Sequence, residues 1–294
     1  MSISNFVFGE NIPLLRLEEF SQEYILNVEN TFLMGKENPP ISLKTSSEFL
    51  LDQKKEADFI YNAIRLLKIK GDTEDHAIRP FLMQSLAFAD ISQNIQIKRS
   101  TYGKILSVLN KGDLWENWQE WKKTKLASVF PEEKHQIKFV SNYEKGLKSF
   151  EEELKKNLQY TLLLPEVYGL IFPPNTYYSF LSGPFSIRSR LMHEVEYSYQ
   201  LKLVRLEEEN NNLFVEFHSV PNNLDELIKS HIKKLYKNEK GFSIDQLEFD
   251  IKAKYNFEKS TGKIINAELH FVEKMHDHLA YLIDMDLQTK SYSS

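Results

Sequence analysis

The chain has 294 residues, 41% of them apolar, and a net charge of −5, so it is long enough for one large domain or two ordinary ones with a buried core. The acidic balance opposes attraction to phosphate backbones, and we therefore expect no nucleic acid partner. The absence of cysteine excludes disulfides, thiolate catalysis and cysteine-ligated zinc.

Residues 1–112 are predicted to be rich in β-strands. Tyr24, Leu26 and Val28 alternate with polar residues, which is the period of a strand with one buried face. The apolar run over residues 59–69 predicts a second strand.

A short helix and a hairpin complete this N-terminal segment. Residues 76–89 have helical spacing, with Pro80 in the first turn, where its missing N–H removes no hydrogen bond. Residues 91–109 are predicted to form a β-hairpin, because Gly103 can adopt the positive φ that such a turn needs.

Residues 113–164 are predicted to form a central helical hairpin. Asp113 is the expected cap of the first helix. The three tryptophans of the chain, Trp115, Trp118 and Trp121, fall on one stripe of that helix. We expect the stripe to pack in a core; the alternative is that its rings stack on bases or sugars.

Residues 165–190 are predicted to form a loop rich in proline and aromatic residues. If its aromatic side chains are exposed, they make the kind of apolar patch that binds a partner. If they fold down instead, they close the open end of a β core. The candidate binding residues are the aromatic side chains of this loop: Tyr168, Phe172, Tyr177, Tyr178, Phe180 and Phe185.

Residues 191–294 contain the strongest pattern of the chain, a β-meander that follows a short helix over residues 224–236. Three stretches alternate between apolar and polar residues, which gives neighbouring antiparallel strands one dry and one wet face. The apolar members are Leu247, Phe249, Ile251, Ala253, Tyr255 and Phe257, then Ile265, Ala267, Leu269 and Phe271, then Leu279, Tyr281, Ile283, Met285 and Leu287.

These elements predict an α+β fold, in which antiparallel β-meanders form a curved sheet that is covered by helices, including the central helical hairpin. The turn sequences at residues 100–105 and 260–264 are similar. Duplication of a β unit would explain the similarity, and so would two hairpins that use the same turn residues independently. The chain is accordingly either one integrated domain or two similar β units.

No catalytic motif accompanies these strands. The His-Asp-His sequence of residues 276–278 offers ligand side chains without an evident third ligand, and we interpret it as a polar turn. His193 and Glu194 begin a zinc-protease motif, but Tyr197 stands where its second histidine belongs. We therefore expect no catalytic residue, no metal site and no cofactor.

Three functional hypotheses follow. The sequence favours a non-catalytic interaction protein that binds a protein partner, as an adaptor, assembly factor or immunity-type inhibitor does. The first alternative is a carrier of a lipid or another apolar small molecule in a half-barrel of curved sheet. The second is an enzyme whose carboxylates and histidines meet only in three dimensions. No segment resembles a membrane span or a signal peptide, so a cytoplasmic location is expected, or a periplasmic one if a signal peptide was removed.

Overall fold

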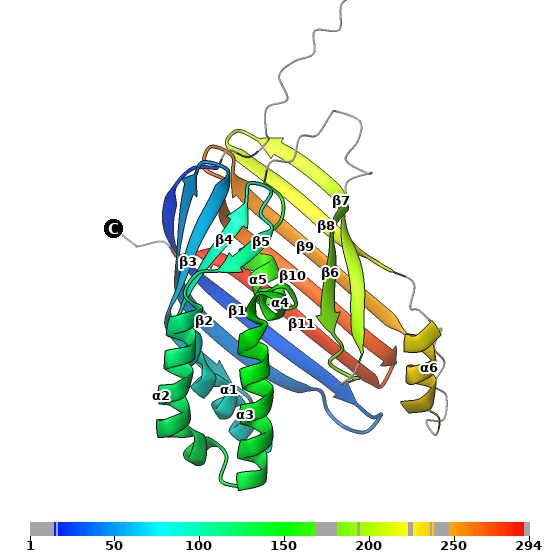
Figure 1. Cartoon of the computed structure of the whole chain (residues 1–294). Helices are drawn as coiled ribbons and strands as arrows, with labels where there is room; N and C mark the ends of the chain where they lie inside the picture. The colour runs from blue at the N-terminus through cyan, green and yellow to red at the C-terminus, as the bar shows by residue number, and fades with distance from the viewer. Residues whose placement is uncertain are drawn as a thin grey trace, which may run out of the picture.

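The computed structural model shows one antiparallel sheet with helices on its concave side (Figure 1). It describes residues 15, 17–168, 181–192, 195–222, 226–235, 237 and 247–290. Within them the sheet has 11 strands, in the order β5-β4-β3-β2-β1-β11-β10-β9-β8-β7-β6. The strands are β1 (Phe20–Met34), β2 (Ile41–Glu56), β3 (Phe59–Asp72), β4 (Asn94–Ser100), β5 (Ile105–Val108), β6 (Leu181–Arg188), β7 (Glu196–Glu209), β8 (Asn212–Pro221), β9 (Glu248–Glu258), β10 (Lys263–His276) and β11 (Leu279–Thr289).

The two β-rich halves of the chain meet in the middle of this sheet. β1 pairs with β2 on one side and with β11 on the other, so that Tyr24 lies between Phe49 and Thr289. The halves therefore form one continuous sheet, whose two edges are β5 and β6.

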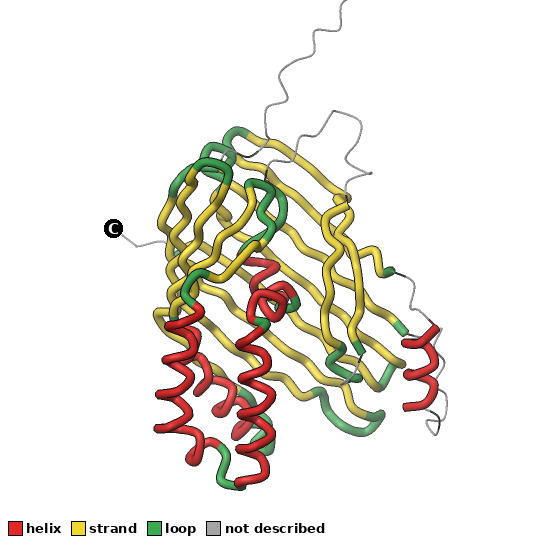
Figure 2. Tube along the Cα trace, in the orientation of Figure 1, coloured by secondary structure: helices red, strands yellow, loops and turns green. Residues whose placement is uncertain are grey.

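The sheet curves around part of the helical segment. Figure 1 shows the strands near both edges turning toward the same side, with α4 and α5 between them. Figure 2 shows α2 and α3 side by side, extending beyond one end of the sheet. The helices are α1 (Arg79–Ala87), the 3-10 helix η1 (Phe88–Ser92), α2 (Lys111–Val129), α3 (Glu133–Lys148), α4 (Phe150–Lys155), α5 (Leu158–Leu163) and α6 (Glu226–Leu235). The predicted α+β fold, with its curved antiparallel sheet and central helical hairpin, is confirmed.

None of the helices in the described ranges is both long and apolar enough to cross a membrane.

The period of two sets the two faces of the sheet as predicted, with one shift. In β9 the dry row is buried from Ile251 to Phe257, and in β11 from Tyr281 to Leu287. In β10 the prediction that Ile265 faces inward is wrong, because a bulge between Ile264 and Asn266 turns Ile264 inward instead.

Two apolar cores hold these layers together. The main core lies between the sheet and α4–α5, where Tyr255 donates a hydrogen bond to the backbone oxygen of Thr161 at 3.1 Å. The second core belongs to the helices, and its fully buried members are Ile91, Trp118 and Trp121. The helical hairpin is thus anchored to the sheet at one end and packs on η1 at the other.

The tryptophan stripe is only partly buried. Trp118 and Trp121 are in the second core, as expected, whereas Trp115 is 39% exposed. The expected cap is also different, since α2 begins at Lys111 without a side-chain capping bond from Asn110. Asn110 Oδ1 instead accepts a hydrogen bond from the amide of Gln96 at 2.9 Å, which ties the helix start to β4.

Strand β2 was not predicted because its inward row is only half apolar. Phe49 and Leu51 are buried, but Thr45, Ser47 and Gln53 occupy other positions of the same row. Their polar side chains hide the period of two that identified the meander.

Strand β6 lies inside the segment that was predicted to be a loop. Its sequence contains Gly183 and Pro184, which are typical of turns. Among the described strands β6 pairs with β7 alone, which makes it an edge strand. An edge strand tolerates a proline because one side of it does not need backbone N–H donors.

Candidate functional site

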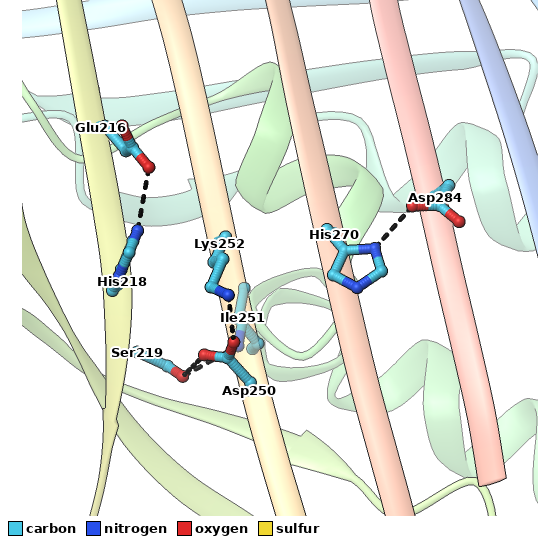
Figure 3. A network of polar contacts seen from close by, with 8 residues as sticks. All are labelled: Glu216, His218, Ser219, Asp250, Ile251, Lys252, His270 and Asp284. Carbon is cyan, nitrogen blue, oxygen red and sulfur yellow. Dashed lines mark hydrogen bonds and ion pairs between the residues drawn. The ribbon is translucent and has the colours of Figure 1, made fainter.

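The outward face of the sheet carries charged side chains in register. One row runs through directly paired residues from β3 to β8: Asp72, Lys44, Glu29, Asp284, His270, Lys252 and His218. In Figure 3, His270 Nδ1 lies 2.6 Å from Asp284 Oδ1. His218 Nε2 lies 2.9 Å from Glu216 Oε1 on its own strand. Within the row itself, His270 contacts Asp284 and Lys44 contacts Glu29, whereas His218 and Lys252 pair with residues outside it.

Asp250 is the most connected acid in this view. Its carboxylate accepts a hydrogen bond from Ser219 Oγ at 3.3 Å and pairs with Lys252 Nζ at 3.1 Å (Figure 3). Ser219 Oγ in turn accepts a hydrogen bond from the amide of Ile251 at 2.8 Å. The network therefore joins β8 to β9 where their regular pairing ends.

Glu29 faces Asp284 across the strands, which places two like charges together. Ser42 donates a hydrogen bond to Glu29 at 2.7 Å, and Lys44 Nζ lies 3.4 Å from the same oxygen. The hydrogen bond from Ser42, with help from Lys44, lowers the pKa of Glu29, so this carboxylate is held as an anion.

An open hollow of about 870 Å³ lies over β1–β3 and β9–β11 on this face, and we call it the outer groove. Its charged lining has both signs: Lys44, Lys70, Lys252 and Lys254, with Glu29, Asp72, Glu268, Asp284 and Asp286. No group of three or more metal-type ligands occurs in the part of the chain that the structure describes. The outer groove therefore presents charges of both signs on the outward face of the sheet.

One small void on the inside of the curved sheet is lined by described residues. The void between α5 and β7–β9 measures about 30 Å³, which is room for roughly one water molecule. Tyr160, Phe185, Phe217 and Tyr255 are among the side chains around it. This void has no space for an apolar ligand.

A second large hollow lies between the helical hairpin and the end of β6, and we call it the helix–strand groove. It measures about 960 Å³. A smaller hollow of about 310 Å³ adjoins it and shares Phe150, Glu153, Arg188 and Arg190. The lining of the larger part comprises Phe139, Asn142, Tyr143, Lys145, Gly146, Leu147, Ser149, Phe150, Glu153, Arg188, Ser189, Arg190 and Leu191.

The helical wall of this groove is aromatic and packs against the second core. The ring of Tyr143 lies 4.4 Å from that of Trp118, and Phe139 packs on the second core beside it. Burial raises the pKa of Tyr143 to about 12, so its phenol is neutral. Leu147 and Phe150 continue this apolar wall at the junction of α3 and α4.

The opposite wall is cationic and comes from the end of β6 and the residues after it. Arg188 Nη2 lies 2.6 Å from Glu153 Oε1, which makes an ion pair between the two walls. The guanidinium of Arg190 has no ion pair or hydrogen bond among the described residues, and Arg190 is exposed. The groove thus combines an apolar wall with available positive charge.

A buried carboxylate fixes the backbone of this cationic wall. Glu273 on β10 has no exposed surface, and it accepts hydrogen bonds from the Ser189 hydroxyl, from the amide of Arg190 at 2.7 Å and from the Tyr197 hydroxyl at 2.9 Å. Ser189 Oγ also accepts a hydrogen bond from the amide of Met192 at 2.7 Å. The chain around Arg190 is therefore held in place while its side chain reaches solvent.

Comparison with known proteins gives no family for this chain. No protein-family model matches the sequence, and neither does any curated protein. Among solved structures, DynF from the dynemicin biosynthesis pathway of Micromonospora chersina is 7% identical, with a TM-score of 0.23, over 96% of this chain and 85% of that one. A putative outer membrane lipoprotein-sorting protein domain from Vibrio parahaemolyticus is 9% identical, with a TM-score of 0.15, over 92% and 84% of the two chains. These scores are too low to carry an argument about function.

Two of the six predicted binding residues lie in the described part of the chain. Tyr168 is buried and donates a hydrogen bond to the backbone oxygen of Gly262 at 3.1 Å. Phe185 is half-buried, with its ring 5.5 Å from that of Tyr199. Both side chains cover the core. The other predicted binding residues lie outside the described residues: Phe172, Tyr177, Tyr178 and Phe180.

Of the histidines considered for chemistry, the structure describes His270, His276 and His278, and it does not bring His270 to the other two. His270 is on the outward face of β10, whereas His276 lies at its end, with its ring 6.1 Å from that of His278. Asp277, between the last two, pairs with Lys274 at 2.8 Å. His193 and Glu194 fall outside the described residues.

Proposed function

We propose that this protein is a non-catalytic binding protein that holds a small molecule with an apolar part in the helix–strand groove. The supporting observation is the contrast between two hollows. The interior void measures about 30 Å³, whereas the groove measures about 960 Å³ and is open along a wall of Phe139, Tyr143, Leu147 and Phe150. A pocket of this size with aromatic lining is typical of small-molecule sites.

Burial of an alkyl chain against this wall would supply the affinity. Each CH₂ group that leaves water contributes about 0.8 kcal/mol, before the cost of immobilising the ligand is subtracted. The aromatic wall belongs to a packed core, so it is already in place before a ligand arrives, and little order has to be gained on binding.

Gly146 allows a direct test, because it lines the groove from α3 without a side chain. A Cβ at this position would meet nothing closer than Glu153 Cγ at 4.0 Å, so a phenylalanine can be introduced toward the groove. In calorimetric titrations with decanol and decanoate, Gly146→Phe is expected to weaken binding at least tenfold.

Two variants control for this result. Gly146→Ala adds a Cβ without filling the groove, and Gly112→Phe adds the same ring on α2, where an added Cβ meets nothing within 4 Å. Both are expected to bind like the wild type. The proposal fails if neither probe binds the wild type, or if Gly146→Phe leaves their affinity unchanged.

A second candidate function is the binding of a protein partner at the outer groove. The observation that favours it is the mixture of charges over about 870 Å³, since such surfaces select partners by electrostatic complementarity. Affinity purification from the parent cells with the wild type and with a Lys252→Glu, Lys254→Glu variant tests it. A partner of the outer groove is lost from the variant, whereas a partner retained by both binds elsewhere.

A further inference from the structure

The charge of the helix–strand groove is opposite to that of the molecule. The chain as a whole carries −5. Among the residues that line the groove and its adjoining hollow, Lys145, Lys156, Arg188 and Arg190 are cationic and only Glu153 is acidic. The lining thus has a formal charge of +3, or +2 when Glu196, the ion-pair partner of Lys156, is included. A local excess of positive charge on an acidic protein draws anions to this place.

The ion pair between Glu153 and Arg188 shows how an acid binds there. Both residues line the larger groove and the adjoining hollow. Their contact at 2.6 Å uses one terminal nitrogen of the guanidinium, and both side chains remain in contact with solvent. A carboxylate on a ligand can take the place of Glu153, since an exposed pair of this kind contributes little stability.

Arg190 supplies the second cation. Its backbone amide is held by Glu273 at 2.7 Å, whereas its guanidinium has neither an ion pair nor a hydrogen bond within the described ranges. Arginine presents several N–H donors in a plane that matches carboxylate and phosphate oxygens. Arg188 and Arg190 are two positions apart and contribute to the same lining, so both can reach one acidic group.

The adjoining hollow offers further donors of the same kind. Lys156 lines it and pairs with Glu196 at 2.7 Å. Tyr160 also lines it, and its hydroxyl has no hydrogen-bond partner in the described part of the chain. Burial raises the pKa of the Tyr160 phenol, which therefore stays protonated and can donate to an anion.

We infer that the ligand of the helix–strand groove is an anionic amphiphile, whose carboxylate or phosphate group binds Arg190 and Arg188 while its apolar part lies along Tyr143, Leu147 and Phe150. This inference rests on the proposed function and names the class of ligand. The acidic group displaces Glu153 from Arg188, so Glu153 is a competitor of the ligand.

Four probes with ten-carbon chains test the inference by calorimetry: decanoate, whose ten carbons include the carboxyl carbon, decyl phosphate, decanol and decyltrimethylammonium. The two anions are expected to bind at least tenfold more tightly than decanol, and the cation more weakly than decanol. The stronger of the two anions indicates whether the natural acidic group is a carboxylate or a phosphate. Raising the salt concentration should reduce this preference, because the groups involved are exposed.

Variants then locate the acidic group. Arg190→Gln is expected to reduce the affinity for the anions about tenfold and to leave decanol binding unchanged, whereas Glu153→Gln should raise the affinity for the anions several-fold. Arg205→Gln is the matched control, because it removes an exposed guanidinium on β7 that pairs with Glu207. It is expected to change nothing, and thermal melting confirms that each variant is folded.

The outcomes distinguish failure of the anionic-ligand inference from failure of the proposed function. If decanol binds as tightly as the anions, or if Arg190→Gln weakens all probes equally, the anionic ligand is excluded and the apolar site remains. If no probe binds, both the inference and the proposed function fail.

Discussion

At the scale of single residues, Arg99 is a buried charge whose hydrogen-bond partners are all defined by the fold. Its guanidinium is fully buried and donates to the backbone oxygens of Gly103 at 2.8 Å and Pro165 at 2.7 Å, and to Asn62 Oδ1 at 3.2 Å. The ring of Tyr168 lies 5.3 Å away. Burial lowers the pKa of Arg99, but arginine remains protonated in proteins. One cation thereby ties the β4–β5 turn to the segment after α5.

Substitution of Arg99 by methionine tests this role. The variant Arg99→Met leaves three buried acceptors without a donor, so we expect the free energy of unfolding to fall by about 3–5 kcal/mol. Urea denaturation measures the change. Arg205→Met removes an exposed arginine as a control, and its loss should stay below about 1 kcal/mol. Similar losses for the two variants would show that the buried hydrogen bonds of Arg99 do not stabilise the fold.

Glu166 gives a prediction about pH. Burial raises its pKa above the ordinary value of 4.5, although Lys104 and Arg99 act in the opposite direction. The folded state therefore binds the proton more tightly than the unfolded state, and the stability linked to this proton is present below pH 4.5 and lost as the pH rises through the folded-state pKa.

The variant Glu166→Gln removes this dependence. Its melting temperature should exceed that of the wild type at pH 7, and the difference should disappear near pH 3, where the carboxyl is protonated in both states. Glu152→Gln, at an exposed position of α4, serves as the control. A difference between Glu166→Gln and the wild type that is the same at both pH values would contradict the argument.

At the scale of elements, the sequence predicts best those strands whose two faces differ in chemistry. β9 and β11 have charged residues outside and apolar residues inside, so alternation alone identifies them. The composition of β2 and β6 resembles that of loops, and these segments form strands because they pair with neighbouring strands of the sheet. The bulge at Ile264 follows from pairing with β9, which no local pattern records.

The β4–β5 hairpin turn depends on a glycine, as the sequence indicates. Gly103 has a φ of +95°, and a Cβ there would lie 2.6 Å from the backbone oxygen of Pro165. We expect Gly103→Ala to lower the free energy of unfolding by roughly 1–3 kcal/mol, from strain and from displacement of the Arg99 contacts.

In contrast, Gly146→Ala adds a Cβ in open space inside α3 and should stabilise the protein by about 0.5–1 kcal/mol. Chemical denaturation of both variants tests these opposite signs, and destabilisation by Gly146→Ala would contradict the geometry at α3.

At the scale of the whole molecule, the helix–strand groove could not be predicted from the sequence. Its walls come from residues 139–153 and 188–191, which have no common motif. They face each other only because the helical hairpin docks on the concave side of a sheet that ends in β6. Sequence alternation predicts which charges of the meander face outward. It cannot predict a hollow between two layers, because the two walls of that hollow are far apart in the sequence.

The order of the strands predicts how the molecule opens. β1 and β11 lie in the middle of the sheet with partners on both sides, whereas β5 and β6 are its edges and each has one partner. Amides of strands paired on both sides exchange mainly through global unfolding, and edge strands open locally at lower free energy. In hydrogen exchange followed by mass spectrometry, peptides from β1 and β11 should therefore be protected longest, and those from β5 and β6 least. β1 and β11 come from opposite ends of the chain but pair with each other, so their protection should be lost together in increasing denaturant. Loss of the N-terminal half before the C-terminal half would mean that the two halves of the sheet are separate cooperative units, despite the pairing between Tyr24 and Thr289 at their junction.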